Sequence, residues 1–144
     1  MDREIQILLA ERAIAATMND YCHAMDSGEN ARWMDCFTAD AVYEVKLPNG
    51  TVYATLNGTA DLQKFIANYP VLPGHRHVYV TPTYAVDPDA GTAEVSVYWF
   101  VLAGSAKGSA ISSMGTSQDR FVRGGDGKWR MSERRVQTEG MNVG

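Results

Sequence analysis

Long apolar runs are missing from the sequence. The longest, Val97 to Ala103, is far shorter than the ~18–20 residues that a membrane-spanning helix needs. The first residues, Met1 to Glu4, have neither the basic start nor the apolar stretch of a secretion signal. The sequence therefore predicts a cytoplasmic protein with no membrane partner.

Cysteine is also scarce, because Cys22 and Cys36 are the only two. Two cysteines are too few for a disulfide framework, and in a cytoplasmic protein both are expected to be reduced thiols. Their spacing fits no zinc motif. We expect both side chains to serve packing rather than chemistry.

Positive charge is in deficit, with 13 Lys and Arg against 17 Asp and Glu and a net charge of −4. This balance disfavours nucleic acid as a partner. The length of 144 residues predicts one domain over residues 1–144, with 140–144 as a loose tail. An apolar content of 45% is ordinary for a folded protein and excludes a disordered class.

Three helices are predicted in the first half of the chain. The first is marked by apolar residues that recur every three or four positions and form one stripe. These residues are Ile7, Ala10, Ile14, Met18, Tyr21 and Met25. Gly28 predicts the end of this helix. A short second helix is expected from Asn30 through Phe37, and a third over 59–69, ended by Pro70.

The remaining segments have the composition of β-strands separated by turn residues. The expected strands are 42–47, 51–56, 75–86, 92–102, 112–123 and 128–138. Valine and aromatic residues favour strands, and the turn segments PNG (48–50) and GGDG (124–127) favour hairpin turns. Helices followed by a long antiparallel meander predict an α+β fold. A curved sheet wrapped around the first helix would leave a cavity between them.

Histidine titrates nearest to neutral pH, and the chain has three. His75 and His77 are two positions apart and share one face of a predicted strand. Such a pair raises the possibility of a metal site. The residues that follow it, Val78 to Pro82, hold no carboxylate that could complete one, so no metal is predicted.

Two further candidates are charged residues near the ends of predicted elements. Asp26 ends the apolar stripe, and periodicity alone favours a water-exposed helix end, although a carboxylate is electrostatically unfavourable there. Arg134 and Arg135 alternate along the last strand, so only one of them can point into a cavity. Strict alternation would place Arg130 and Ser132 on the same face as Arg134.

Four stretches of the chain resemble the SnoaL-like branch of the NTF2-like superfamily. They are NDYCHAMDSG (19–28), WMDCFTADAVY (33–43), RHVYVT (76–81) and DGKWRMSERRV (126–136). The resemblance covers nearly the whole chain. It implies an NTF2-like α+β cone, in which a curved mixed or antiparallel sheet wraps around N-terminal helices and encloses a cavity. The fold hosts enzymes, enzyme subunits and binding modules, so it says less about the reaction.

The resemblance also implies a set of site residues. Similar dehydratases and dehydrochlorinases carry an aspartate–histidine pair in the cavity, and these positions match Asp26 and His77. Thr81 stands where the family has an asparagine, which leaves His75 as the alternative histidine. In such a pair a neutral His77 would act as the general base. Asp26 would accept the other ring N–H and stabilise the imidazolium.

Two more positions match polar residues of the family. Tyr21 would donate a hydrogen bond to a carbonyl oxygen that gains charge, and Arg134 would bind an anionic group or assist a leaving group. The expected substrate-binding residues are Trp33, Phe37, Tyr43, His75, Tyr79, Trp99 and Met114.

The resemblance therefore implies a cofactor-independent lyase or isomerase that acts on a hydrophobic cyclic or aromatic molecule. We expect a homodimer or homotrimer that needs no cofactor and no metal. Two alternatives stay open at this point. One is the non-catalytic β-subunit of an aromatic-ring dioxygenase, and the other is a small-molecule binding module.

Overall fold

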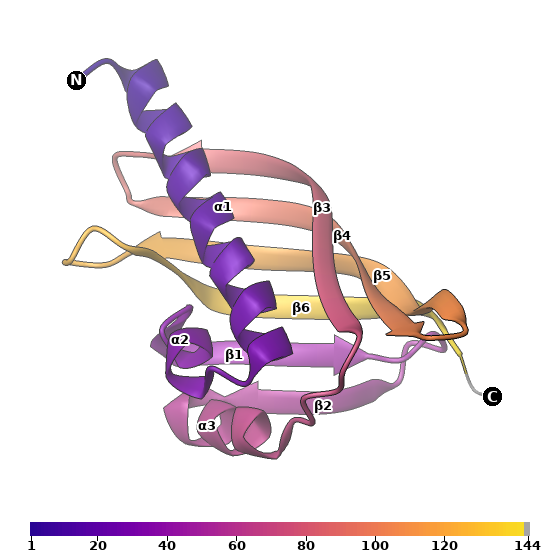
Figure 1. Ribbon diagram of the computed structural model, residues 1–144. Helices are drawn as coiled ribbons and strands as arrows, with labels where there is room; N and C mark the ends of the chain where they lie inside the picture. Colours follow the sequence, from indigo (N-terminus) through magenta and orange to yellow (C-terminus); the bar gives the residue numbers. More distant parts are fainter. Residues whose placement is uncertain (143–144) are drawn as a thin grey trace.

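A long helix lies diagonally across a curved sheet (Figure 1). The structure, a computed structural model, describes residues 1–142. Their helices are α1 (Arg3–Ser27), α2 (Asn30–Met34) and α3 (Gly58–Asn68). Their strands are β1 (Phe37–Lys46), β2 (Val52–Asn57), β3 (His75–Asp87), β4 (Thr92–Ser105), β5 (Gly108–Arg123) and β6 (Trp129–Met141).

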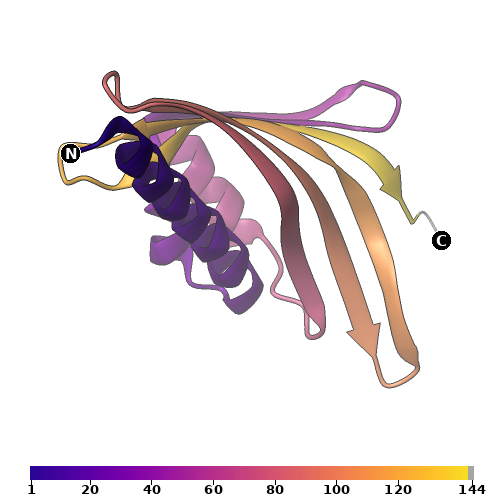
Figure 2. The ribbon, with the colours of Figure 1, turned by 90° about the horizontal axis from the view of Figure 1, so that it is seen from above.

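The strands form a sheet in the order β2-β1-β6-β5-β4-β3. Strands β1 and β6 run parallel, and the other neighbouring pairs are antiparallel. Figure 2 shows that β3, β4 and β5 curve over the side that carries the helices. The expected α+β class and the curved, mixed sheet around N-terminal helices are confirmed. None of the helices within residues 1–142 is long and apolar enough to cross a membrane.

Helix α1 begins and ends where its capping residues predict. The Asp2 side chain accepts hydrogen bonds from two backbone N–H groups of the first turn. Gly28 ends the helix in the left-handed conformation (φ 74°), and its N–H donates to the carbonyl of Ala24. The apolar stripe is buried from Ala10 to Met25, which fixes the rotation of the helix against the sheet.

The second helix is shorter than predicted, and its extension to Phe37 is wrong. Helix α2 ends at Met34, and Phe37 is the first residue of β1. The reason is tertiary, because Phe37 pairs with Met131 of β6 and the neighbouring Cys36 carbonyl accepts from the Met131 N–H. Residues 140 and 141 also belong to β6 rather than to a loose tail, while 143–144 lie outside the described residues.

A β-bulge in β6 changes which side chains point inward. Met131 pairs with Phe121 and Glu133 pairs with Arg120, so Ser132 is an extra residue. Met131 and Arg134 are therefore both buried, although they are three positions apart. The expectation that Ser132 shares the inward face of Arg134 is wrong, because the bulge interrupts the alternation. Arg130 also points outward and binds carboxylates at the surface.

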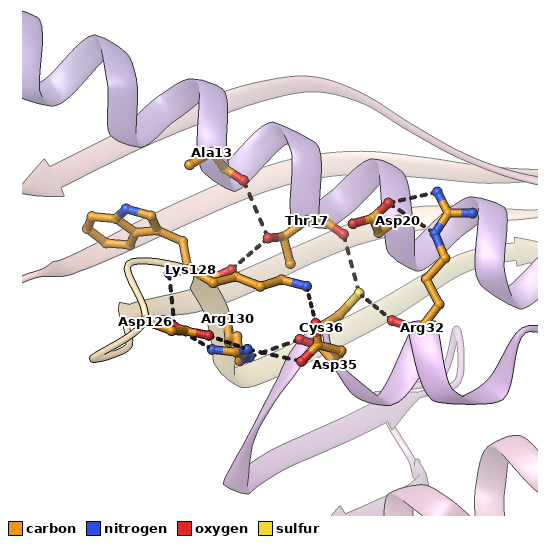
Figure 3. Close-up of polar contacts among 10 residues, drawn as sticks. Ala13, Thr17, Asp20, Arg32, Asp35, Cys36, Asp126, Lys128 and Arg130 are labelled. Atoms are coloured by element: carbon orange, nitrogen blue, oxygen red, sulfur yellow. Dashed lines mark hydrogen bonds and ion pairs between the residues drawn. The ribbon is translucent and has the colours of Figure 1, made fainter.

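A polar cluster joins α1, the start of β1 and the turn before β6 (Figure 3). The Thr17 hydroxyl donates to the carbonyl of Trp129 at 2.6 Å, and the Cys36 thiol donates to the carbonyl of Thr17 at 3.5 Å. Nearby, Arg130 contacts both Asp35 and Asp126 at about the same distances, 3.0 and 2.9 Å. This cluster fixes the end of the sheet that lies away from the candidate site.

Both cysteines are free and buried. Burial raises the pKa of Cys22 to about 12 and that of Cys36 to about 12. Thiols with such pKa values carry almost no thiolate at neutral pH, so they are poor nucleophiles. This agrees with the packing role expected from the sequence.

Candidate functional site

The carboxylate of Asp26 and the ring of His77 meet where the last turn of α1 crosses the start of β3. Asp26 Oδ1 lies 2.6 Å from His77 Nδ1. The backbone N–H of His77 also donates to both carboxylate oxygens at 3.1 Å. The two side chains are only 12% and 11% exposed. Because a carboxylate only accepts hydrogen bonds, Nδ1 carries the hydrogen of the neutral ring and Nε2 carries the lone pair.

These contacts explain why an aspartate is tolerated at a helix C-terminus. The partial negative charge of the helix end disfavours a carboxylate there. Here the N–H groups of the His77 backbone and ring satisfy Asp26. The structure thus pairs Asp26 with His77 and not with His75, whose buried Nδ1 has no hydrogen-bond partner among the described residues.

Tyr69 is a third member of this group that the sequence reasoning did not single out. Its hydroxyl lies 3.1 Å from His77 Nε2, and since Nε2 has the lone pair, the hydroxyl is the donor. Burial raises the pKa of Tyr69 to about 12. The one signal in the sequence was Pro70, which ends α3 and imposes an extended backbone on the residue before it.

A cavity of about 900 Å³ opens beside this group, between the helices and the concave face of the sheet. Its wall is mostly apolar and aromatic, with α3 supplying one side. Five of the predicted site residues line it, namely Tyr21, Tyr43, His77, Tyr79 and Trp99. A second cavity of about 30 Å³, the size of one or two water molecules, lies between Asp26, His75 and His77.

Three predicted lining residues lie elsewhere. Trp33 and Phe37 are buried in the packed core, with ring centroids 5.6 and 6.0 Å from that of Tyr21. They support the cavity wall from behind. Met114 is 43% exposed because alternation along β5 places Gly115 and Ser117 on the inner face and Met114 on the outer face.

Two phenol groups lie together at the cavity wall. The hydroxyl oxygens of Tyr21 and Tyr43 are 2.8 Å apart. Burial raises the pKa of Tyr21 well above its ordinary value, so this phenol is neutral at physiological pH. One hydroxyl donates to the other, which leaves one phenolic hydrogen free to donate to a ligand.

Arg134 lies behind these phenols rather than in the cavity. Its side chain is fully buried, and Nη1 donates to Asp119 Oδ2 at 3.0 Å. The guanidinium carbon lies 4.6 and 4.4 Å from the ring centroids of Tyr21 and Tyr79. The expectation that Arg134 binds an anionic group directly does not fit this position, because the two rings separate it from the cavity.

The electrostatics of the Arg134–Asp119 pair follow from its burial. Burial lowers the pKa of Arg134, but the Asp119 carboxylate and the surrounding Tyr79, Tyr21 and Tyr43 together outweigh burial, so the pKa lies well above its ordinary value. Burial raises the pKa of Asp119, and Arg134 offsets part of that rise. A positive charge is therefore held directly beneath the aromatic wall.

Within residues 1–142, no group of three or more His, Cys, Asp or Glu side chains is placed to hold a metal ion. The potential ligands that line the small cavity are Asp26, His75 and His77. Two of these three, Asp26 and His77, are hydrogen-bonded to each other. The arrangement suits proton transfer by the imidazole.

A helix-covered curved sheet with a cavity on its concave side defines the NTF2-like class, and solved NTF2-like proteins share this fold. A family model for the SnoaL-like domain matches residues 6–135. The chain belongs to this family. No curated protein sequence matches the chain.

Several solved structures are similar. One is Rv3472, a Mycobacterium tuberculosis protein of unknown function, with a TM-score of 0.82 at 24% identity. The match covers 96% of this chain and 76% of that one. A scytalone dehydratase-like protein from Novosphingobium aromaticivorans has a TM-score of 0.78 at 20% identity, covering 96% of this chain and 90% of that one.

A third similar structure is the β subunit of an aromatic-ring-hydroxylating dioxygenase-like protein from the same organism. Its TM-score is 0.80 at 16% identity, covering 96% of this chain and 94% of that one. At such identities these likenesses establish the fold alone, because one fold supports many functions.

Proposed function

We propose that the protein is a cofactor-independent lyase or isomerase that acts on a hydrophobic cyclic or aromatic small molecule. The observation that carries the proposal is the 2.6 Å hydrogen bond between Asp26 and His77, with His77 on the wall of an open cavity. The reaction begins with removal of a proton from a carbon next to a carbonyl group.

His77 is the general base in this proposal. Its Nε2 accepts the proton from carbon, and Asp26 holds the opposite nitrogen and stabilises the imidazolium that forms. The N–H···carboxylate bond joins two opposite charges once the ring is protonated, which strengthens it in the transition state. Asp26 thus lowers the barrier without exchanging a proton with the substrate.

The paired phenols stabilise the negative charge that develops on the carbonyl oxygen. Tyr21 and Tyr43 are 2.8 Å apart, and their free hydrogen donates to the enolate oxygen, a contribution of ~3 kcal/mol for a well-placed donor. Arg134, 4.6 Å below the Tyr21 ring, adds positive potential from behind. Loss of a leaving group from the enolate completes a lyase reaction, and return of the proton at another carbon completes an isomerisation.

The cavity supports an apolar substrate. Its volume of about 900 Å³ is near the upper end of the ~300–1,000 Å³ usual for ligand sites. The aromatic rings of Tyr43, Phe65 and Trp99 line it, so a flat ring system can pack against them.

The test is a screen of cyclic β-hydroxy ketones and hydroaromatic acids for a new conjugated absorbance. We expect Asp26→Asn and His77→Ala each to lower turnover at least ~100-fold while the circular dichroism spectrum stays that of the wild type. Asp20→Asn is the matched control, because Asp20 is on the same helix but pairs with Arg32 at the surface. Near-normal rates in both site variants would contradict the proposal.

The alternatives predict different assemblies. A homodimer or homotrimer that converts substrate without another chain supports the enzyme. A β-subunit role, which the fold likeness alone supports, requires a larger partner. A binding module would release its ligand unchanged, and product analysis after incubation separates that case from catalysis.

A further inference from the structure

The hydroxyl of Tyr69 occupies a position that neither the sequence nor the resemblance assigns. It lies 3.1 Å from His77 Nε2, the ring nitrogen that Asp26 leaves available. Tyr69 also lines both the large cavity and the small one behind the Asp26–His77 pair. A substrate that places a C–H bond against Nε2 displaces this hydrogen bond, and the Tyr69 hydroxyl can then donate to the substrate instead.

The backbone fixes this hydroxyl in place. Tyr69 is the residue that ends α3, with φ −75° and ψ 125°, and its N–H donates to the carbonyl of Ile66. Pro70 favours this extended conformation. The ring packs against Phe65 with centroids 5.6 Å apart. The position of the hydroxyl thus follows from the end of a helix rather than from a flexible loop.

The two neighbouring groups have complementary proton affinities. Burial raises the pKa of Tyr69 to about 12, so the phenol carries its proton throughout the physiological range. Nε2 carries a lone pair because Nδ1 donates to Asp26. An acid and a base therefore lie side by side on one wall of the cavity.

We propose that Tyr69 is the general acid of an elimination reaction in which His77 is the base; this inference rests on the proposed function. The substrate's C–H bond breaks, its proton goes to Nε2, and its electron pair forms the new double bond. The C–O bond to a β-hydroxyl breaks, and the departing oxygen takes the Tyr69 proton and leaves as water. The Tyr69 phenolate then takes the proton from Nε2, which restores both groups.

This arrangement specifies the stereochemistry. An anti elimination needs the acid and the base on opposite faces of the substrate. Here Tyr69 Oη and His77 Nε2 lie 3.1 Å apart, so both reach the same face. The hydrogen and the hydroxyl group are therefore lost from one face, in a syn elimination.

The experiment compares two leaving groups in Tyr69→Phe. The probes are 3-hydroxycyclohexanone, whose hydroxyl must be protonated to leave, and 3-(4-nitrophenoxy)cyclohexanone, whose 4-nitrophenolate leaves without an acid. We expect Tyr69→Phe to lower kcat at least ~100-fold on the first probe, the usual contribution of a general acid. On the second probe the change should be less than about fivefold by the same reasoning. Tyr98→Phe is the matched control, because Tyr98 of β4 is 61% exposed and lines neither cavity.

Two further readouts separate the possible failures. Loss of the Tyr69 donor should move the ¹⁵N resonance of His77 Nε2 in Tyr69→Phe and not in Tyr98→Phe. Deuterium placed at C2 of the hydroxy probe, cis to the hydroxyl, should be lost in the product. If Tyr69→Phe lowered kcat equally on both probes, or if the deuterium were retained, Tyr69 would not be the general acid. The proposed function would not be affected by that result. A wild type inactive on both probes would contradict the proposed function, and this inference with it.

Discussion

Arg134 and Asp119 form an ion pair in which both side chains are fully buried, with 3.0 Å between Nη1 and Oδ2. The Ser117 hydroxyl donates to the other carboxylate oxygen at 2.6 Å, so the carboxylate is satisfied on both sides. Removing one member of such a pair leaves an uncompensated buried charge, which is far more costly than removing both.

Arg134→Met should therefore destabilise the protein by ~3–5 kcal/mol, measured as the free energy of unfolding in urea. Arg135→Met is the control, since Arg135 is 48% exposed and reaches its carboxylates at 3.6 and 3.7 Å; it should cost less than ~0.5 kcal/mol. The double variant Arg134→Met/Asp119→Leu should regain part of the free energy of unfolding that Arg134→Met loses. Equal stability of the two single variants would contradict the prediction.

Acid should weaken the contact between β6 and the turn that precedes it. The hydrogen bond from Arg130 lowers the pKa of Asp126 to about 2, below the ~3.9 of an unfolded aspartate. A carboxylate whose pKa is lower in the folded than in the unfolded state stabilises the fold at pH values above its unfolded-state pKa. This stabilisation is lost as the pH falls through the folded-state pKa. The urea concentration at the unfolding midpoint should decrease as the pH is lowered from 4 to 2.

Asp126→Asn removes this titration. The fall in the urea midpoint between pH 4 and pH 2 should be smaller in Asp126→Asn than in the wild type. Asp89→Asn is the comparison, because Asp89 is an exposed turn aspartate whose ion pair with Arg3 joins other elements. If the urea midpoint of Asp126→Asn fell in acid as much as that of the wild type, Asp126 would not be a cause of the acid sensitivity.

On the inner face of β4, the packed core ends and the cavity begins between Val97 and Val101. Val97 is buried in the core at 3% exposure, whereas Val101, on the same face, lines the cavity. Val97→Phe should cost ~1–3 kcal/mol because it overpacks the core. Val101→Phe should change stability by less than ~0.5 kcal/mol and reduce the binding of an apolar fluorescent dye. Urea unfolding and dye titration test both, and an equal loss of stability would mean that no such boundary exists.

Thr81 has a left-handed backbone, with φ 52°, where the pairing of β3 with β4 is irregular. A β-branched residue rarely adopts this conformation, and asparagine adopts it more readily. The asparagine that the resemblance implies for the family at this position would fit this local backbone better. Thr81→Asn should stabilise the protein by about 1 kcal/mol.

Thr83→Asn is the control for that prediction. Thr83 pairs with Ser96 in regular strand geometry, where asparagine is less favourable than threonine. The thermal midpoint should rise in Thr81→Asn and fall in Thr83→Asn. A fall in both would show that the left-handed backbone at Thr81 is not strained.

Local sequence signals predicted the elements well where the residues themselves decide the structure. Gly28 ends α1 because glycine tolerates the left-handed conformation, and the apolar stripe from Ala10 to Met25 is the buried face. Phe37 shows the limit, because a parallel partner 94 positions away determines its strand. No local pattern encodes that partner.

The candidate site was predictable only in part for a similar reason. The resemblance indicated Asp26 and His77, which the structure places 2.6 Å apart. Alternation could not place Arg134, since the extra residue Ser132 changes the phase of β6. Tyr69 was missed because its only signal is the proline that follows it, and a proline predicts a helix end rather than the direction of a hydroxyl.

Strand β6 has a consequence for the order of assembly during synthesis. The β1–β2 hairpin joins the rest of the sheet only through β6, which is the last of the six strands to be synthesised. Asp26 and His77 are made long before it, on α1 and β3, but the cavity residues Val136 and Thr138 come from β6. A nascent chain can therefore bring Asp26 and His77 together before it has a cavity to hold a substrate, and the activity we propose would appear only once β6 has been inserted.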